Sequence, residues 1–294
     1  MIHMTFLICW VIGMCAQLVD GAMGMGFGVV GTTLLTLSGS TPVAAAASVH
    51  FAEMGTTMAS GMAHWRRGNV DRRLLVRVGV PGGIGAFLGA FVLSSISLGG
   101  MRPFNNAILI AVGVYLLVLR GSRRRDGRGA GRMVHGSIGV VGGFIDAAGG
   151  GGWGAVATPT LLATGSEARK VVGTVSAAEF MVACMASAGY LAGAGSLFNW
   201  AVVGGLMAGG VAMAPVAARV AAKADPRKLF TAIGVSVIVF NTYGLAALHG
   251  KSGMGADLGI AAGMGVLALW VTKKLGGRGE GATSRERDMV MSSQ

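Results

Sequence analysis

The chain has 294 residues, of which 53% are hydrophobic, 12% are charged and 52 are glycines. This balance lies far outside that of a water-soluble domain of this length, and the apolar stretches are long enough to cross a hydrocarbon layer, which takes about 20 helical residues. The net charge of +12 comes from Lys and Arg clusters beside the apolar stretches, which is typical of membrane topology signals and argues against a nucleic-acid partner. We therefore expect an all-α polytopic membrane protein, in contact with the lipid bilayer.

The first half of the chain begins with an apolar region that glycines interrupt, Met4–Ser38. Three longer apolar spans follow it, at Thr41–Ala63, Leu74–Ile96 and Phe104–Leu119. Each of the three is expected to form a transmembrane helix.

The second half has the same order of elements. A glycine-interrupted region, Met133–Thr164, precedes three apolar spans at Val171–Ala194, Trp200–Ala222 and Leu229–Leu248. An extra transmembrane helix is expected at Ala256–Thr272, before a polar tail.

The two halves match each other in sequence. Sliding the chain by 126 positions gives an ungapped match from about position 12 to position 83. Because the chain has only 12 acidic residues, the coincidence of Asp20 with Asp146 and of Glu53 with Glu179 indicates a duplicated unit. The predicted organisation is a first repeat (1–119), a basic cytoplasmic linker (120–132), a second repeat (133–249), an extra transmembrane helix (250–272) and a polar cytoplasmic tail (273–294).

The basic joints between spans indicate how the chain crosses the membrane. Arg66–Arg73, Arg120–Arg132 and Arg219–Lys228 are basic and should face the cytoplasm. Traced from these joints, Thr41–Ala63 runs inward and Val171–Ala194 runs outward, so the two repeats have inverted topology. Each glycine-interrupted region must then be a hairpin that starts and ends on one side, with legs of about 16 residues, or roughly 24 Å. We expect re-entrant or strongly tilted half-helices in a multi-pass protein of the inner (plasma) membrane, with the N-terminus outside and the C-terminus in the cytoplasm.

The glycine-rich breaks are the candidate substrate site. Broken apolar segments at matching positions of inverted halves indicate a site near the bilayer midplane, where half-helix N-termini offer N–H groups and a positive dipole end to an oxyanion. Close helix packing is the alternative reason for such glycines. The candidate substrate-binding residues are Gly24, Gly26, Gly28, Thr32, Gly150, Gly151, Gly152, Trp153, Gly154 and Thr158.

Four acids and one histidine lie at membrane depth. Asp20 and Asp146 enter the two breaks, Glu53 and Glu179 lie in the next spans, and His50 precedes Glu53 by three residues on the same helical face. A desolvated carboxyl can hold or release a proton, so these five residues are candidates for proton coupling or gating. The alternative is structural: the two aspartates cap half-helices, and the other groups bond nearby backbone.

The second break resembles the signature of a known family. The run Gly149-Gly-Gly-Gly-Trp-Gly-Ala-Val-Ala-Thr-Pro-Thr-Leu-Leu162, with its duplicated counterpart in the first half, is similar to the sulfite exporter TauE/SafE family, over roughly Met4–Leu248. The resemblance implies a multi-helix inner-membrane carrier for sulfite, sulfonates or related small anions. The first half departs from the usual pattern, because Gly24-Met-Gly-Phe-Gly28 replaces a run of adjacent glycines.

The aspartates at both breaks keep other functions open. Ionised carboxylates would repel a dianion, so a carrier for a divalent metal or another cation is the main alternative to an anion carrier. A membrane assembly subunit without cargo is a third possibility. The sequence contains no P-loop, metal-ligand cluster or catalytic triad, so we expect neither an enzyme nor a cofactor. A homo-oligomer is compatible with the sequence.

Overall fold

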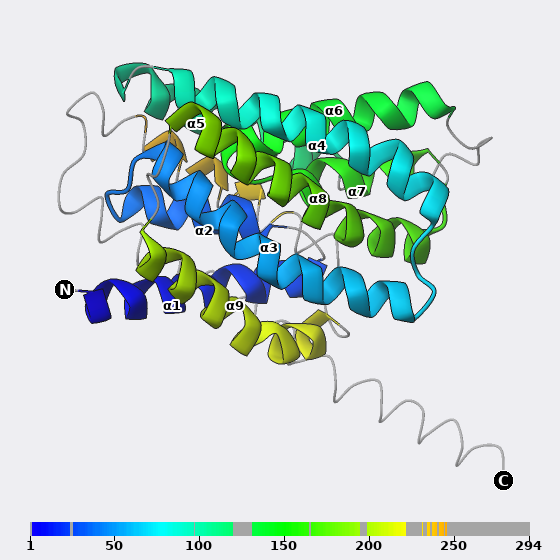
Figure 1. The fold of residues 1–294 in the computed structure, drawn as a ribbon, viewed down its shortest axis with the longest axis horizontal. Coiled ribbons are helices and arrows are strands. Elements are labelled where there is room, and N and C mark those ends of the chain that lie inside the picture. The colour runs from blue at the N-terminus through cyan, green and yellow to red at the C-terminus, as the bar shows by residue number, and fades with distance from the viewer. Residues whose placement is uncertain are drawn as a thin grey trace, which may run out of the picture.

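The chain forms a bundle of helices in the computed structural model (Figure 1). The structure describes residues 2–23, 26–96, 98–119, 131–164, 166–194 and 199–221, together with ten separate positions between 231 and 245. In this part of the chain there are helices and no strands, as expected for an all-α protein. The helices are α1 (Ile2–Met23), α2 (Phe27–Leu37), α3 (Pro42–Arg66), α4 (Arg72–Ser95), α5 (Leu98–Leu119), α6 (Arg132–Gly149), α7 (Trp153–Ala163), α8 (Ala168–Ala194) and α9 (Trp200–Ala221).

Most of the predicted spans agree with these helices. The spans that correspond to α3, α4, α8 and α9 begin and end within three residues of the helix bounds. The helix that corresponds to the predicted span Phe104–Leu119 is longer than expected: α5 begins at Leu98 and includes Pro103. The proline removes one backbone hydrogen bond from the helix without ending it.

The two legs of each predicted hairpin differ in length, which corrects the expectation of equal legs. α1 has 22 residues and α6 has 18, whereas α2 and α7 have 11 residues each. Eleven helical residues span roughly 16 Å, about half of a hydrocarbon layer. Among the described residues, three segments are long and apolar enough to cross a membrane: His3–Asp20, Arg72–Ser95 and Arg169–Ala194.

Glycines bring helices of the two halves into backbone contact. α6 packs along α4, where a Cβ added at Gly139 or Gly143 would collide with the carbonyls of Val78 and Gly82. α9 packs along α1, and a Cβ added at Gly209 would collide with the carbonyl of Trp10. In both pairs the two helices run parallel to each other. Small residues permit this close approach, as in other membrane helix pairs. The first helix of each half therefore packs mainly against a helix of the other half.

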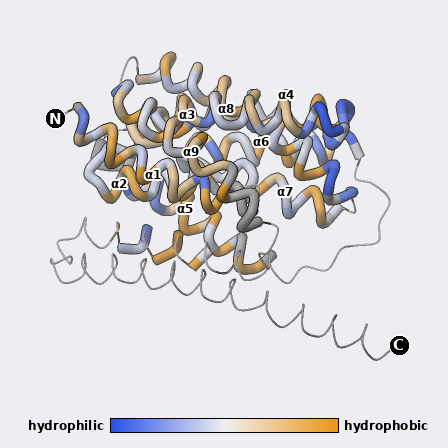
Figure 2. The backbone as a smooth tube through the Cα atoms, turned by 90° about the horizontal axis from the view of Figure 1, so that it is seen from below, coloured by the Kyte–Doolittle hydropathy of each residue, from blue (hydrophilic) through white to orange (hydrophobic). Residues whose placement is uncertain are grey.

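α3 and α8 pack against each other in antiparallel directions at the centre of the bundle. Gly61 lies against Ala177, and the α3–α4 joint lies against the start of α8. There the Lys170 Nζ donates to the Gly68 carbonyl at 2.7 Å, and the Asp71 backbone N–H donates to the Thr174 hydroxyl at 2.9 Å. Figure 2 shows hydrophilic residues gathered at this end of the bundle, near α4.

Asp71 is the N-cap of α4, and its removal is expected to destabilise the fold. Its Oδ1 accepts the backbone N–H groups of Arg73 at 2.8 Å and Leu74 at 3.1 Å. We expect Asp71→Ala to lower the free energy of unfolding by about 1 kcal/mol, because two first-turn N–H groups lose their acceptor. Asp71→Asn keeps an acceptor oxygen and should change the free energy of unfolding by only a few tenths of a kcal/mol. Thermal unfolding of the purified protein in detergent measures both, and equal stability of Asp71→Ala and the parent protein would contradict the capping role.

Several predictions concern residues outside the described part of the chain. They are the linker from residue 120 to 130, the extra helix at Ala256–Thr272, the tail and Gly24; the span Leu229–Leu248 is described only at separate positions.

Candidate functional site

Each short helix follows a break at a glycine with positive φ. The breaks separate α1 from α2 and α6 from α7. Gly26, which immediately precedes α2, has φ 120°, and Gly152, which immediately precedes α7, has φ 139°. These two glycines are 126 positions apart in the sequence, so the duplicated unit carries the same backbone conformation twice. Only glycine adopts such angles without strain, which explains its presence at both positions.

The side chain of an aspartate from the preceding helix binds the first residue of each short helix. Asp20 Oδ1 accepts the backbone N–H of Phe27 at 3.4 Å, and Asp146 Oδ1 accepts that of Trp153 at 2.7 Å. In both cases the carboxylate lies seven residues before the amide. A carboxylate at this place satisfies a first-turn N–H group and faces the positive end of the helix dipole. The capping geometry considered from the sequence is thus present in both halves, while a part in proton coupling stays a prediction.

The two breaks meet inside the protein. A Cβ added at Gly28, in the first turn of α2, would lie 2.5 Å from the Gly151 Cα, just before α7. Thr32, one turn further along α2, donates its hydroxyl to the Gly150 carbonyl. The first turns of α2 and α7 therefore lie side by side, with the candidate glycines of the two halves in contact.

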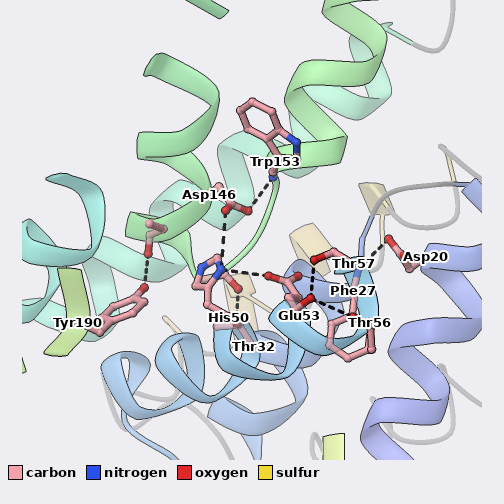
Figure 3. A network of polar contacts seen from close by, with 12 residues as sticks. Asp20, Phe27, Thr32, His50, Glu53, Thr56, Thr57, Asp146, Trp153 and Tyr190 are labelled. Atoms are coloured by element: carbon pink, nitrogen blue, oxygen red, sulfur yellow. Dashed lines mark hydrogen bonds and ion pairs between the residues drawn. The ribbon is translucent and has the colours of Figure 1, made fainter. Parts of the chain in front are cut away.

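A histidine from α3 joins carboxylates of both halves (Figure 3). His50 Nδ1 lies 3.0 Å from Glu53 Oε2 and 3.8 Å from Asp146 Oδ2. His50 is fully buried, and Glu53 and Asp146 are only 2% and 3% exposed. A buried ion is tolerated only when a partner and hydrogen bonds replace water, and here carboxylates of both halves lie beside the one buried imidazole.

Two residues that the sequence did not single out complete the site. The Tyr190 hydroxyl donates to the Ala147 carbonyl, and the Tyr190 ring stacks on His50 with the ring centroids 5.9 Å apart. Asn105 Nδ2 donates to the Gly149 carbonyl at 2.8 Å. Both side chains satisfy carbonyls at the broken end of α6, as a backbone break in lipid requires. A polar residue inside an apolar span is the signal that identifies such side chains.

Trp153 is a core residue of the α7 end of the bundle. It is fully buried, its Nε1 donates to the Val175 carbonyl at 3.1 Å, and its ring lies against Gly82 of α4. Its counterpart at the 126-residue offset is Phe27. These contacts are those of a core residue, and the predicted part of Trp153 in substrate binding stays a prediction.

We expect Trp153→Phe to cost about 1–3 kcal/mol of stability, because the change removes a buried hydrogen bond and leaves a small cavity. The midpoint of thermal unfolding in detergent measures the loss. Trp200→Phe is the control, since Trp200 is 69% exposed and should lose less. A parental midpoint for Trp153→Phe would show that the indole N–H contributes nothing to stability.

The remaining described candidates are buried residues of α7 and α8. Glu179 projects from α8, is 9% exposed and interacts electrostatically with Asp20, Glu53 and Asp146. Gly154 is buried in the first turn of α7. Thr158 is buried further along α7, and within the described part of the chain its hydroxyl has no hydrogen-bond partner.

In the described part of the chain, this cluster coincides neither with a metal-ligand set nor with the cavity between α5, α6 and α7. Among the described residues, no three His, Cys, Asp or Glu side chains are arranged to hold a metal ion. A cavity of about 540 Å³ opens between α5, α6 and α7, with a mainly apolar lining that includes Ile108, Val141 and Val156 and contains no acid. Because its wall offers almost nothing to a charged ligand, we place the candidate site at the glycine breaks.

Comparison with known proteins identifies the family. Residues 9–244 match the family model described as "Sulfite exporter TauE/SafE". The chain is 42% identical over 237 residues to the "Probable membrane transporter protein YtnM" of Bacillus subtilis (strain 168), an alignment that covers 78% of this chain and 79% of the relative. No solved structure matches the chain. The chain is therefore a membrane transporter and belongs to the sulfite exporter TauE/SafE family.

Proposed function

We propose that this transporter moves a small sulfur oxyanion, such as sulfite or a sulfonate, across the inner membrane. The observation that carries the proposal is the meeting of two half-helix N-termini at Gly28 and Gly151. Their dipoles converge where an anion would gain from both, and the positive ends of discontinuous helices serve this purpose in other transporters. The name of the matching family supports sulfite or a related anion as the cargo.

We further propose that the two halves are inverted repeats around this site. The antiparallel packing of α3 and α8, which match each other at the 126-residue offset, is what inverted halves require. The joint after α3 and the start of α8 carry Arg66, Arg67, Arg169 and Lys170, so this end is proposed to face the cytoplasm. Movement of one half against the other would open the site to either side.

The cluster of acids and His50 makes proton coupling part of the proposal. An anion entering among Asp20, Glu53, Asp146 and Glu179 meets repulsion unless carboxylates are protonated. His50 lies between carboxylates of both halves and is placed to pass a proton between them.

A flux assay tests the proposal against a cation carrier. The full-length protein in proteoliposomes is assayed with sulfite, methanesulfonate, sulfate and a panel of divalent metal ions, with and without a pH gradient. Saturable flux of at least one sulfur oxyanion above that of protein-free vesicles, accelerated by the gradient, is the expected result. Saturable metal uptake without oxyanion flux would contradict the anion carrier and favour the cation carrier. Oxyanion flux that is the same with and without the pH gradient would contradict proton coupling.

A further inference from the structure

The Glu53 carboxylate lies against the first turn of α2. A Cβ added at Gly28 would lie only 2.9 Å from Glu53 Oε1, so the carboxylate oxygen lies close to the first turn of a helix. That position favours a negative oxygen, because first-turn N–H groups and the dipole end are both positive. A carboxylate and a sulfur oxyanion present the same kind of acceptor oxygen, so either of them suits this position.

The same carboxylate already has beside it the imidazole that, once protonated, a bound oxyanion would need. His50 Nδ1 lies 3.0 Å from Glu53 Oε2. The other imidazole nitrogen, His50 Nε2, and the Thr158 hydroxyl are buried and, within the described residues, have no hydrogen-bond partner. Buried polar atoms without partners are costly, which makes them candidates for bonds to a ligand.

The charge around Glu53 limits what can be added. The titratable groups that face Glu53 from the elements packed around it are Asp20 of α1, His50 of α3, Asp146 of α6, and Glu179 and Tyr190 of α8. Only one of these five groups can be a cation. A second negative charge beside an ionised Glu53 would therefore find no countercharge, whereas exchange of one negative charge for another leaves the balance unchanged.

We propose that the Glu53 carboxylate occupies the cargo's place in the empty carrier, and that an oxyanion enters only as Glu53 takes up one proton and leaves its contact with Gly28. The proton stays on Glu53 while the cargo is bound and is released when the carboxylate returns. Each bound anion is thus accompanied by one proton. This inference rests on the proposed anion transport and adds the residue that sets the coupling ratio.

The repeat partner of Glu53 does not share this arrangement. Glu179 occupies the equivalent position on α8, but the nearest atoms to a Cβ added at Gly26, Gly150, Gly151 or Gly152 include no carboxylate, whereas those at Gly28 include Glu53 Oε1. The proposal therefore assigns the competition with cargo to Glu53.

Binding measured against pH tests the proposal. Methanesulfonate is the probe, because it remains a monoanion between pH 5.5 and 8, and binding to the full-length protein in nanodiscs is followed by calorimetry in buffers of different ionisation enthalpy. For the parent protein we expect uptake of about one proton per bound anion and an affinity that falls up to about tenfold per pH unit where Glu53 is ionised. Glu53→Gln should take up no proton and keep its affinity within about twofold over the whole range.

Two further variants make the outcome decisive. Glu53→Ala, which empties the position beside Gly28, should also bind at every pH, and it replaces Glu53→Gln if that variant does not yield folded protein. Asp71→Asn is the control for loss of a carboxylate far from the site, and its affinity should depend on pH as that of the parent protein does. If the affinity of both Glu53 variants still falls with pH as in the parent protein, the role of Glu53 is overturned and anion transport is left standing. If the parent protein binds none of sulfite, sulfate and methanesulfonate, the proposed function fails and this inference fails with it.

Discussion

Replacing Gly151 with alanine is expected to reduce transport at least tenfold. Gly151 has φ 142°, a region that alanine adopts only with strain of about 1–3 kcal/mol. A Cβ at this position would also collide with the backbone of Gly28 and Val29 at the start of α2. Because neither backbone can move aside as a flexible side chain would, the first turns of α2 and α7 must separate, and the place where both dipoles converge is lost.

The measurement is oxyanion flux in proteoliposomes, normalised to the amount of folded protein. Gly136→Ala is the matched control, because Gly136 lies on the neighbouring helix α6 and a Cβ added there meets nothing within 4 Å. Alanine there should raise helix stability by about 1 kcal/mol and leave flux unchanged. Parental flux in Gly151→Ala would mean that the contact between the two breaks is not needed for transport.

The sequence identified the two breaks because their chemistry is rare in apolar segments. Asp20 and Asp146 matched at one offset among few acids, and the glycines beside them matched as well. The unequal hairpin legs were missed for a local reason. The sequence placed Asp20 at the entry to the first break, but α1 continues beyond it to Met23, and the Asp20 carboxylate accepts the Phe27 amide from within the helix.

The contacts across the halves could not be read from the duplicated pattern. His50 has Ser176 as its repeat partner, so symmetry gave no indication that it faces Asp146. Asn105 and Tyr190 reach carbonyls of the α6 end from α5 and α8, over more than 40 residues of sequence. Such pairs depend on how helices pack in three dimensions, and helical periodicity specifies only the face on which a residue lies.

Asp146→Ala is expected to be the most destabilising change of a single acid in the site. Asp146 is 3% exposed, accepts the Trp153 backbone N–H at 2.7 Å and lies 3.8 Å from His50, so its loss leaves a buried N–H group without its acceptor and removes one of the two carboxylates beside the buried imidazole. Removal of one partner from a buried charged pair costs about 3–5 kcal/mol. Asp146→Asn keeps an oxygen for the Trp153 amide and should lose less stability while still altering the pH dependence of transport.

Asp20→Ala provides the comparison within the same chain. Its hydrogen bond to Phe27 is longer, at 3.4 Å, and the side chain is only partly buried, so we expect a loss of about 1 kcal/mol. Chemical unfolding of the purified proteins in one detergent measures both losses under the same conditions. Equal losses would show that the shorter bond and the His50 contact add nothing to the second break. A larger loss for Asp146→Ala would mean that the α6–α7 break is held more firmly than the α1–α2 break, so that repeats with matching sequences differ in rigidity at the point where they meet.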